Sequence, residues 1–596
     1  MLDNTNACPQ WNLRDLYISP TSEQFSKDFK TLESDVNDFE DTYKGNILGH
    51  DSNYDKQAKR LKNSINKYEE LINLIGKLSA YSTLYHVTNT SDPVRTKFYG
   101  DTHTKITEIS NKVIFYELEL NKLEDNVLDK LLTHADLSKY KSWFKNIRKY
   151  KPHQLTDEIE KIFQEKSMTS FSAWNRLFDQ TISNMKVSLD GRSVSLEEAL
   201  NLLLSDKEQE RKTAFLAVSS KLEENIPLFT HIMNTICQDK AISDKWRNYS
   251  NSEESRHLAN NIEPEVISAL VNTVESNYEN TSHRYYALKA KLLNKTYLES
   301  WDRNAPLPDA NTKPIEWSEA KEIVIEAYEE FSKDIADIVR LFFDNNWIDA
   351  RVNEGKVNGA FAHPVTTDTH PYILLNYQGK PRDVMTLAHE LGHGVHQVLA
   401  SDLGPLLSDT PLTLAETASV FGEMLTYKKL VRKTSNDLEK KVLLASKIED
   451  MINTVVRQIS FFKFEQYVHQ KRKAGELTAE DINNIWIDTQ SDSLGPAIKM
   501  HEQHKYLWAY IPHFIHSPFY VYAYAFGDCL VNSLYAIYED NPTNFVDKYI
   551  RLLSSGGAKH HKDLLTPFGL DTSNPDFWDS GLSLISSMID ELEKIS

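Results

Sequence analysis

The stretch DVMTLAHELGHGVHQV, residues 383–398, decides the interpretation of this 596-residue chain. It places His389 and His393 four residues apart, with Glu390 beside the first. On an α-helix, positions i and i+4 lie on one face, one turn apart. Both imidazoles can therefore reach a single Zn²⁺ ion, with Glu390 close enough to act on a water bound to it. The H-E-x-x-H pattern thus predicts one zinc ion per chain.

The same stretch has the periodicity of an amphipathic helix. Apolar residues recur every three or four positions and form a stripe for burial: Val384, Leu387, Ala388, Leu391, Val395 and Val398. The histidines, His396 included, fall on a second stripe. Asp383, which follows Pro381, is the predicted N-cap. The metal-binding face and the core face of this helix are therefore expected to be separate.

A third metal ligand is predicted in the next helix. Catalytic zinc sites usually have three protein ligands and leave the fourth position to water. Glu416 and Glu423 follow a loop that lets the chain reverse, and they lie two helical turns apart, so both point the same way. A carboxylate buried there without a metal or partner would be costly. We expect Glu416 to bind the metal and Glu423 to hydrogen-bond a ligand histidine; the alternative is two solvated glutamates.

Small side chains would let these two helices pack closely. The second helix carries three such residues, Ala415, Ala418 and Gly422. With zinc in place, Glu390 is expected to take the proton of the attacking water and pass it to the leaving nitrogen. The oxyanion that develops needs a further hydrogen-bond donor besides the metal.

The segment IPHFIHSPFYVYAYAFG, residues 511–527, is the candidate source of that donor. Tyrosine hydroxyls and a histidine N–H are suitable groups. Tyr520 and Tyr524 stand at i and i+4 and would share a helix face, whereas Tyr522 would point elsewhere. The alternative is an aromatic stripe that packs in the core.

The rest of the chain predicts a mainly α-helical protein. Long helical patterns alternate with little glycine or proline. Residues 187–194 resemble a short hairpin with Asp190-Gly191 at its turn, and Ser195 would cap the helix that follows. A domain boundary is placed near residue 195.

A small β-sheet is expected next to the metal helix. Residues 357–379 contain short extended runs, which predict two or three strands, including residues 372–377. An exposed edge there would pair with an extended peptide near the zinc. The alternative is an ordinary core strand.

Composition limits the partners and the compartment. A net charge of −19 argues against general affinity for nucleic acid and against docking to anionic lipid. The three cysteines are far apart, which favours a reducing compartment over a disulfide scaffold. The start, MLDNTNACPQW, lacks the pattern of a signal peptide, and no apolar run approaches the ~20 residues needed to cross a bilayer. These features predict a cytoplasmic protein with neither a membrane nor a nucleic-acid partner.

Several motifs together resemble a known family. TLAHELGHGVHQ (386–397), followed by PLTLAETASVFGEML (411–425), is similar to the M3 family of zinc peptidases. Four further segments resemble oligoendopeptidase F within it: IPHFIHSPFYVYAYAFG (511–527), PYILLNYQG (371–379), WNLRDLY (11–17) and SAWNRLFDQ (172–180).

The resemblance implies a fold, a reaction and a set of residues. It implies a largely helical molecule divided by a deep channel with zinc near its floor, in which short unstructured peptides are cleaved internally. Residues 1–195 would cover the channel, and residues 196–596 would form the catalytic region. His389, His393 and Glu416 match the zinc ligands, and Glu390 matches the catalytic carboxylate. The substrate-contacting segment is matched by His513, Tyr520 and Tyr524.

Two other functions remain open at this point. One is a metallocarboxypeptidase on a related fold, which would need a basic or polar pocket for the free C-terminus of its substrate. The other is a non-catalytic peptide-binding homologue, although a binding protein has no need of the base Glu390. Neither the oligomeric state nor the preferred peptide follows from the sequence.

Overall fold

The chain folds into two compact units, each assembled from three separate segments. The computed structural model describes residues 8–308, 313–434 and 436–595. Unit 1 consists of Met1–Lys151, Thr312–Lys433 and Asn541–Gly569, and unit 2 of Pro152–Asn311, Thr434–Asp540 and Leu570–Ser596. The predicted boundary near residue 195 lies inside unit 2. The functional division at that residue stays a prediction, and so does the channel. The prediction that the start lacks a signal peptide concerns residues 1–7, which lie outside the described residues.

Unit 1 is built mainly from helices. In chain order its helices and strands are α1 (Glu23–Tyr43), α2 (Tyr54–Val87), α3 (Pro93–Ser110), α4 (Phe115–Lys122), α5 (Asp125–Leu131), α6 (Lys141–Lys149), α14 (Trp317–Phe331), α15 (Lys333–Asp344), β4 (Ile348–Asp349), β5 (Phe361–His363), β6 (Tyr372–Leu374), α16 (Pro381–Ala400), α17 (Leu412–Lys433), α23 (Pro542–Leu553) and α24 (His561–Leu565).

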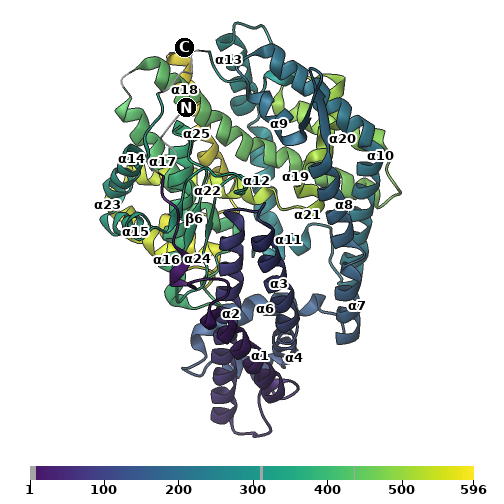
Figure 1. The fold of residues 1–596 in the computed structure, drawn as a ribbon, viewed down its shortest axis with the longest axis vertical. Helices are drawn as coiled ribbons and strands as arrows, with labels where there is room; N and C mark the ends of the chain where they lie inside the picture. The colour runs from purple at the N-terminus through teal and green to yellow at the C-terminus, as the bar shows by residue number, and fades with distance from the viewer. Residues whose placement is uncertain (1–7, 309–312, 435, 596) are drawn as a thin grey trace. The chain divides into compact units, whose positions relative to one another are not determined.

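The first three helices pack side by side, as Figure 1 shows in purple and dark blue. In α1 the buried residues recur every three or four positions, which is the pattern of one helix face packed on a core. Its start is fixed by Ser22, whose hydroxyl accepts the amide of Phe25 at 3.3 Å. Helix α3 begins with Asp92 as N-cap and Pro93 in the first turn, where its missing N–H costs nothing.

The sheet of unit 1 has three short strands in the order β4-β6-β5. β6 pairs in parallel with β4 and antiparallel with β5, and all three of its residues are buried. The predicted exposed edge at residues 372–377 is therefore wrong, because β6 is the central strand and both its edges are paired. The buried Lys356 ammonium holds the adjoining backbone by donating to the carbonyls of Asp349, Arg351 and Leu375 and to the Asp349 carboxylate.

The C-terminal segment of unit 1 completes the packing around α17. Tyr549 of α23 donates a 2.8 Å hydrogen bond to the carbonyl of Thr417. Its ring and that of Phe545 pack against Phe421 of α17, with centroids 4.6 and 5.7 Å away. Residues 541–569 are therefore an integral part of this unit.

Unit 2 is also helical. Its elements are α7 (Asp157–Ser167), α8 (Phe171–Asn184), β1 (Lys186–Leu189), β2 (Arg192–Ser195), α9 (Leu196–Asn201), α10 (Glu208–Trp246), α11 (Glu254–Ala259), α12 (Pro264–Ser276), α13 (Arg284–Leu292), β3 (Leu298–Glu299), α18 (Asp437–Thr454), α19 (Val456–Arg472), α20 (Ala479–Leu494), β7 (Ile498–Lys499), the 3₁₀ helix η9 (Glu502–Tyr510), α21 (His513–His516), α22 (Tyr522–Asp540) and α25 (Pro575–Lys594).

The hairpin predicted from residues 187–194 is present. β1 and β2 pair antiparallel, and Asp190 and Gly191 both have positive φ angles, 49° and 78°. Two successive positive φ values are those of the two-residue turn that matches the twist of a hairpin. Ser195 caps α9 as predicted, because its hydroxyl accepts the amide of Glu198 at 3.1 Å.

The prediction of a mainly α-helical fold with a small sheet beside the histidine helix is confirmed. Among the described residues, no helix is both long enough and apolar enough to cross a membrane. All three cysteines, Cys8, Cys237 and Cys529, are buried, and none of them forms a disulfide.

Candidate active site

Helix α16 carries the two histidines of the H-E-x-x-H segment. It begins at Pro381, and its N-cap is Lys380, three residues before the predicted N-cap at Asp383. Asp383 instead sits inside the first turn, where its carboxylate accepts the backbone amides of Gln378 and Lys380 at 2.8 and 3.0 Å. Proline favours the first helical position because its φ angle is already helical. The apolar stripe faces the core as predicted, except that Val398 is only half-buried.

Helices α16 and α17 approach so closely that side chains are excluded at their crossing. A Cβ atom on Gly392 would lie 2.4 Å from the carbonyl oxygen of Ala418. A Cβ atom on Gly422 would lie 1.8 Å from the hydroxyl oxygen of Tyr328, which itself donates to the Ala388 carbonyl at 2.8 Å. The close approach predicted from the small residues of the second helix is therefore present, with Gly392 as a partner that the prediction did not include.

This crossing brings three potential metal ligands together. Glu416 Oε2 lies 3.4 Å from His389 Nε2 and 3.5 Å from His393 Nε2. One ligand atom from each of the three residues lies within 4.8 Å of the other two. All three side chains are partly buried. Two imidazole nitrogens and one carboxylate oxygen that converge in this way can hold a metal ion.

Two hydrogen bonds orient these ligands. His389 Nδ1 lies 3.2 Å from Glu423 Oε2, so the opposite ring nitrogen faces Glu416. The Ser419 hydroxyl donates to Glu416 Oε2 at 2.7 Å. Such contacts fix the ring orientation and the tautomer of a ligand histidine. Glu423 thus lies where the sequence placed it, whereas Ser419 was not predicted, because a serine on a helix carries no signal for this role.

The charges of the site act strongly on one another. Burial favours a low pKa for His389, but the hydrogen bond to Glu423 and the charges of Glu416 and Glu423 outweigh it and raise the pKa to about 9. Burial lowers the pKa of His393 to about 4. Burial alone would raise the pKa of Glu416, yet the two histidines and Ser419 hold it below its usual value. The group therefore contains a carboxylate that stays ionised between two imidazoles.

Glu390 is the most deeply buried acid of this group, with 6% of its surface exposed. Burial is the main cause that raises its pKa to about 7, with the negative charge of Glu416 acting in the same direction. Its carboxylate accepts a hydrogen bond from the backbone amide of Ala362 in β5. A carboxyl group with a pKa near neutrality can both accept and release a proton under ordinary conditions.

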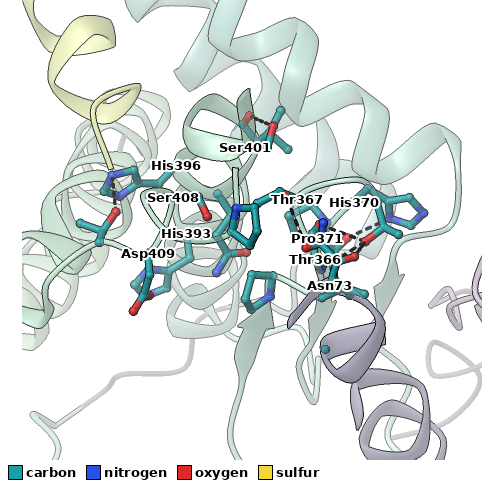
Figure 2. A pocket seen from close by; sticks show the side chains of 18 of the residues that line it. Asn73, Thr366, Thr367, His370, Pro371, His393, His396, Ser401, Ser408 and Asp409 are labelled. Carbon is teal, nitrogen blue, oxygen red and sulfur yellow. Dashed lines mark hydrogen bonds between the residues drawn. The ribbon is translucent and has the colours of Figure 1, made fainter. Parts of the chain in front are cut away.

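A cavity of about 450 Å³ adjoins His393 in unit 1. Figure 2 shows His393 and His396 on one side of it, and Thr366, Thr367 and His370 on the other. His396 is buried and lies 3.3 Å from the Thr410 hydroxyl. Burial lowers its pKa to about 4, so it is a neutral wall of the cavity and lies outside the three-ligand group.

Unit 2 contains the other predicted site residues. His513 Nε2 lies 3.3 Å from the Tyr524 hydroxyl, and the Tyr524 ring lies 5.2 Å from that of Tyr520. Burial lowers the pKa of His513, and the charge of Arg457 acts in the same direction. The three residues thus form one cluster, although Tyr520 precedes helix α22 and does not share its face with Tyr524 as predicted.

A strained turn produces this arrangement. Phe519 has a φ angle of 61°, an uncommon value for a bulky residue. Its backbone amide donates to the buried carboxylate of Glu465 at 2.8 Å, and its ring packs on His469 at 4.7 Å. Arg256 donates to the Pro518 carbonyl at 3.3 Å. These supports were not predicted, because they come from α11 and α19, far away along the chain.

Tyr522 points away from this cluster, as the sequence predicted. Its hydroxyl is buried between Asn260 Nδ2, at 2.8 Å, and His257 Nδ1, at 3.1 Å. Burial raises its pKa above the range in which it ionises. Tyr522 therefore anchors the start of α22 in the core.

The family of the chain follows from comparison with known proteins. The model of Peptidase family M3 matches residues 201–584, and that of Oligopeptidase F matches residues 119–186. The chain belongs to peptidase family M3. The match includes every residue of the two clusters described above, and it confirms the resemblance that the sequence motifs indicated.

Relatives of the family match nearly the whole chain. An oligoendopeptidase F homolog of Borreliella burgdorferi is 26% identical over 99% of this chain and 98% of its own length. Oligopeptidase PepF of Bacillus subtilis is 27% identical over 98% of this chain and 87% of its own length.

Solved structures of other proteins share the fold. A peptidase from Chlamydophila abortus superposes with a TM-score of 0.83 at 22% identity, covering 99% of this chain and 98% of the other. Oligoendopeptidase-F from Enterococcus faecium gives a TM-score of 0.71 at 21% identity, covering 96% and 99%.

Proposed function

We propose that this M3 peptidase is a zinc-dependent endopeptidase that hydrolyses internal bonds of short, unstructured peptides. One observation carries the proposal: ligand atoms of His389, His393 and Glu416 converge within 4.8 Å, with the buried Glu390 beside them. The names of the relatives, oligoendopeptidase F and oligopeptidase, support oligopeptides as substrates.

The donor set fits zinc. Two neutral imidazoles and one carboxylate form a common ligand set of catalytic zinc, and the fourth position is left to water. Zinc would take the place of the proton that Glu416 and Glu423 stabilise on His389, because a ligand imidazole must be neutral. When bound, zinc would polarise the scissile carbonyl and lower the pKa of water to about 7.

The remaining steps belong to side chains of the chain itself. Glu423 and Ser419 hold His389 and Glu416 in the orientation that ligation needs. Glu390 takes a proton from the attacking water onto its carboxylate and then gives it to the nitrogen of the leaving amine. Burial favours uptake of the proton, because it raises the pKa of the carboxyl group.

We assign contact with the peptide to His513, Tyr520 and Tyr524. Their side chains lie together and carry N–H and O–H donors, which are the groups that stabilise an oxyanion. The similarity of residues 511–527 to the substrate-contacting segment of oligoendopeptidase F supports this assignment.

The test combines peptide turnover with metal analysis. Purified protein is assayed on an internally quenched fluorescent peptide, before and after dialysis against a chelator, and again after zinc is returned. Glu390→Gln should lower kcat/KM by about 10²–10⁴-fold, because a positioned base contributes about that much, while the bound zinc stays unchanged. Glu322→Gln, an exposed isosteric change in the same unit, serves as the control.

Two outcomes would refute the proposal. Full activity of Glu390→Gln would show that Glu390 is not the base of the reaction. Full activity after complete removal of the metal would show that the reaction does not need zinc. A peptide-binding protein without catalysis would bind the peptide but leave it intact in every arm. The masses of the products distinguish an endopeptidase from a metallocarboxypeptidase, since a carboxypeptidase releases only fragments from the C-terminal end.

A further inference from the structure

A second cavity lies wholly within unit 2 and is lined by two arginines. It has a volume of about 210 Å³ and is bounded by residues of α9, α19, α20 and η9 and by the segment around Trp301. Arg303 and Arg457 both contribute to its wall, and both are partly buried. The volume is below the 300–1,000 Å³ typical of drug-sized ligand pockets, so it suits one residue or one end of a peptide.

The two guanidinium groups lack a carboxylate partner among the described residues. None of the residues that line the cavity is acidic. The nearby acids already have basic partners: Asp302 pairs with Arg211 at 2.7 Å and with Lys295 at 2.5 Å, Glu299 with His501 at 2.5 Å, and Glu449 with Lys289. Buried charges in proteins are normally paired, because desolvation without a counter-charge is costly.

Arg457 shows the effect of the missing negative charge. Burial, and then the positive charge of Arg303, lowers the pKa of Arg457 to about 10. The Nε atom of Arg457 is buried and has no hydrogen-bond partner within the described chain. Burial lowers the pKa of His504 to about 3, so this neighbour is neutral and adds no charge to that of the two arginines. An oxyanion would meet two permanent cations there.

The rest of the wall suits a peptide residue better than a bare inorganic ion. Leu200, Leu203, Leu204 and Leu507 form an apolar side, while Asn304 adds an amide beside the arginines. A carboxylate attached to a hydrocarbon side chain satisfies both sides, because the guanidinium fork binds carboxylates through two parallel hydrogen bonds.

The cavity also adjoins the cluster assigned to substrate. Tyr510 lines it, hydrogen-bonds to Arg457 and stands three positions before His513 along the chain. The charge of Arg457 reaches His513, whose pKa it lowers after burial. A group bound at the arginines would therefore lie near His513 in the same unit.

We propose that Arg303 and Arg457 bind a carboxylate of the peptide substrate in this cavity. The inference rests on the proposed function, since it names a subsite of the same peptidase. The carboxylate has two possible sources, the free C-terminus of a short peptide or an acidic side chain within it. Either one would select among peptides by charge.

Binding is tested separately from cleavage, so that the two proposals can fail independently. A labelled peptide is titrated into Glu390→Gln by fluorescence anisotropy, in four forms: with a free or amidated C-terminus, and with Glu or Gln at the position before it. Loss of the recognised carboxylate should weaken binding by ~10- to 100-fold, or about 1.4–2.8 kcal/mol at 1.4 kcal/mol per tenfold, because the desolvated guanidinium groups lose their counter-charge. The form that shows the loss identifies the source.

Variants of the two arginines test whether they cause the difference in binding between peptides with and without the carboxylate. In Arg303→Gln or Arg457→Gln on the same background, the forms with and without that carboxylate should bind within about twofold of each other. Arg176→Gln, an exposed change in unit 2, should keep the full difference. Arg303→Gln keeps the test valid if Arg457→Gln fails to fold.

Three results would overturn the inference. One is equal binding of all four peptides to the parent protein. The second is a charge preference that survives Arg303→Gln. The third is inorganic phosphate that binds at the arginines without displacing any of the peptides, which would make the cavity a site for a separate anion. Cleavage of peptides without charge preference would leave the proposed endopeptidase intact and remove only this subsite.

Discussion

The two clusters of this peptidase are positioned in different ways. His389, His393 and Glu416 project from regular helices, and glycines at the helix crossing set the distance between them. His513, Tyr520 and Tyr524 instead depend on an irregular turn, which is held by a buried carboxylate and an arginine from two other helices. The first arrangement depends mainly on two helices that follow one another along the chain, whereas the second also needs α11 and α19 in place. Loss of a supporting contact should therefore disturb the tyrosines more than the metal ligands.

The largest effect is expected from Glu416, since it touches both histidines. Glu416→Ala should lose bound zinc on dialysis and should lower kcat/KM by ~10³-fold or more, because it removes one of three ligands. Glu423→Gln should cost only about 10- to 100-fold in zinc affinity, the usual price of an outer hydrogen bond to a ligand. Metal analysis and turnover measure both. An unchanged zinc content in Glu416→Ala would show that Glu416 is not the third ligand and would assign that role to Glu423.

A smaller effect is expected in the tyrosine cluster, with the metal left in place. Tyr524→Phe should lower kcat by about 10²–10³-fold, the range for removal of one oxyanion donor, at unchanged zinc content. Tyr522→Phe is the matched control. It should lower the free energy of unfolding by ~1–3 kcal/mol, because Asn260 and His257 lose their partner, but keep its activity at low temperature. The reverse pattern would exchange the roles of the two tyrosines.

Two variants of Glu465 test whether its role as a hydrogen-bond acceptor holds the turn at Phe519. Glu465→Gln retains an oxygen that can accept the Phe519 amide, whereas Glu465→Met has none. We expect Gln to keep kcat within about twofold and Met to lower it ~10-fold, since removal of the acceptor frees a turn with a costly φ angle. KM and zinc content should change little. Equal losses in both variants would show that the turn needs the carboxyl group itself and not merely an acceptor oxygen.

The smallest effect concerns acid stability beneath the same turn. Burial lowers the pKa of His469 to about 3, so the folded chain keeps it neutral while the unfolded chain protonates it near pH 6.5. Its stabilising effect is complete above pH 6.5 and is lost as the pH falls toward 3, by at most ~1.4 kcal/mol per pH unit. Urea unfolding at pH 7.5 and 5.0 should show a smaller loss for His469→Gln than for the parent. Identical losses would contradict the buried neutral state.

The features that sequence predicted are those with a fixed local period. The spacing from His389 to His393 and the position of Glu416 follow from helix geometry, and the Asp190-Gly191 turn follows from the φ angles that it requires. Pro381 held the signal for the true start of α16, since proline prefers the first helical position.

The features that sequence did not predict depend on distant partners. β6 is central because a two-residue strand, Ile348–Asp349, pairs with its second edge, and two residues leave no pattern to recognise. The positive φ angle of Phe519 brings Tyr520 next to Tyr524. This angle could not be predicted, because the position carries neither glycine nor asparagine, the residues that favour it. Arg303 and Arg457 share a cavity although they lie far apart along the chain.

The interleaving of the two units also bears on how the protein is made. Tyr549 bonds to the carbonyl of Thr417, one residue after Glu416, across 132 positions of sequence. At about 5–20 residues per second, a ribosome takes on the order of ten seconds to bridge that interval. During this time the helix that carries Glu416 lacks the aromatic packing of α23. The packing around the helix that carries Glu416 is therefore completed only after α23, which ends at Leu553, has been synthesised.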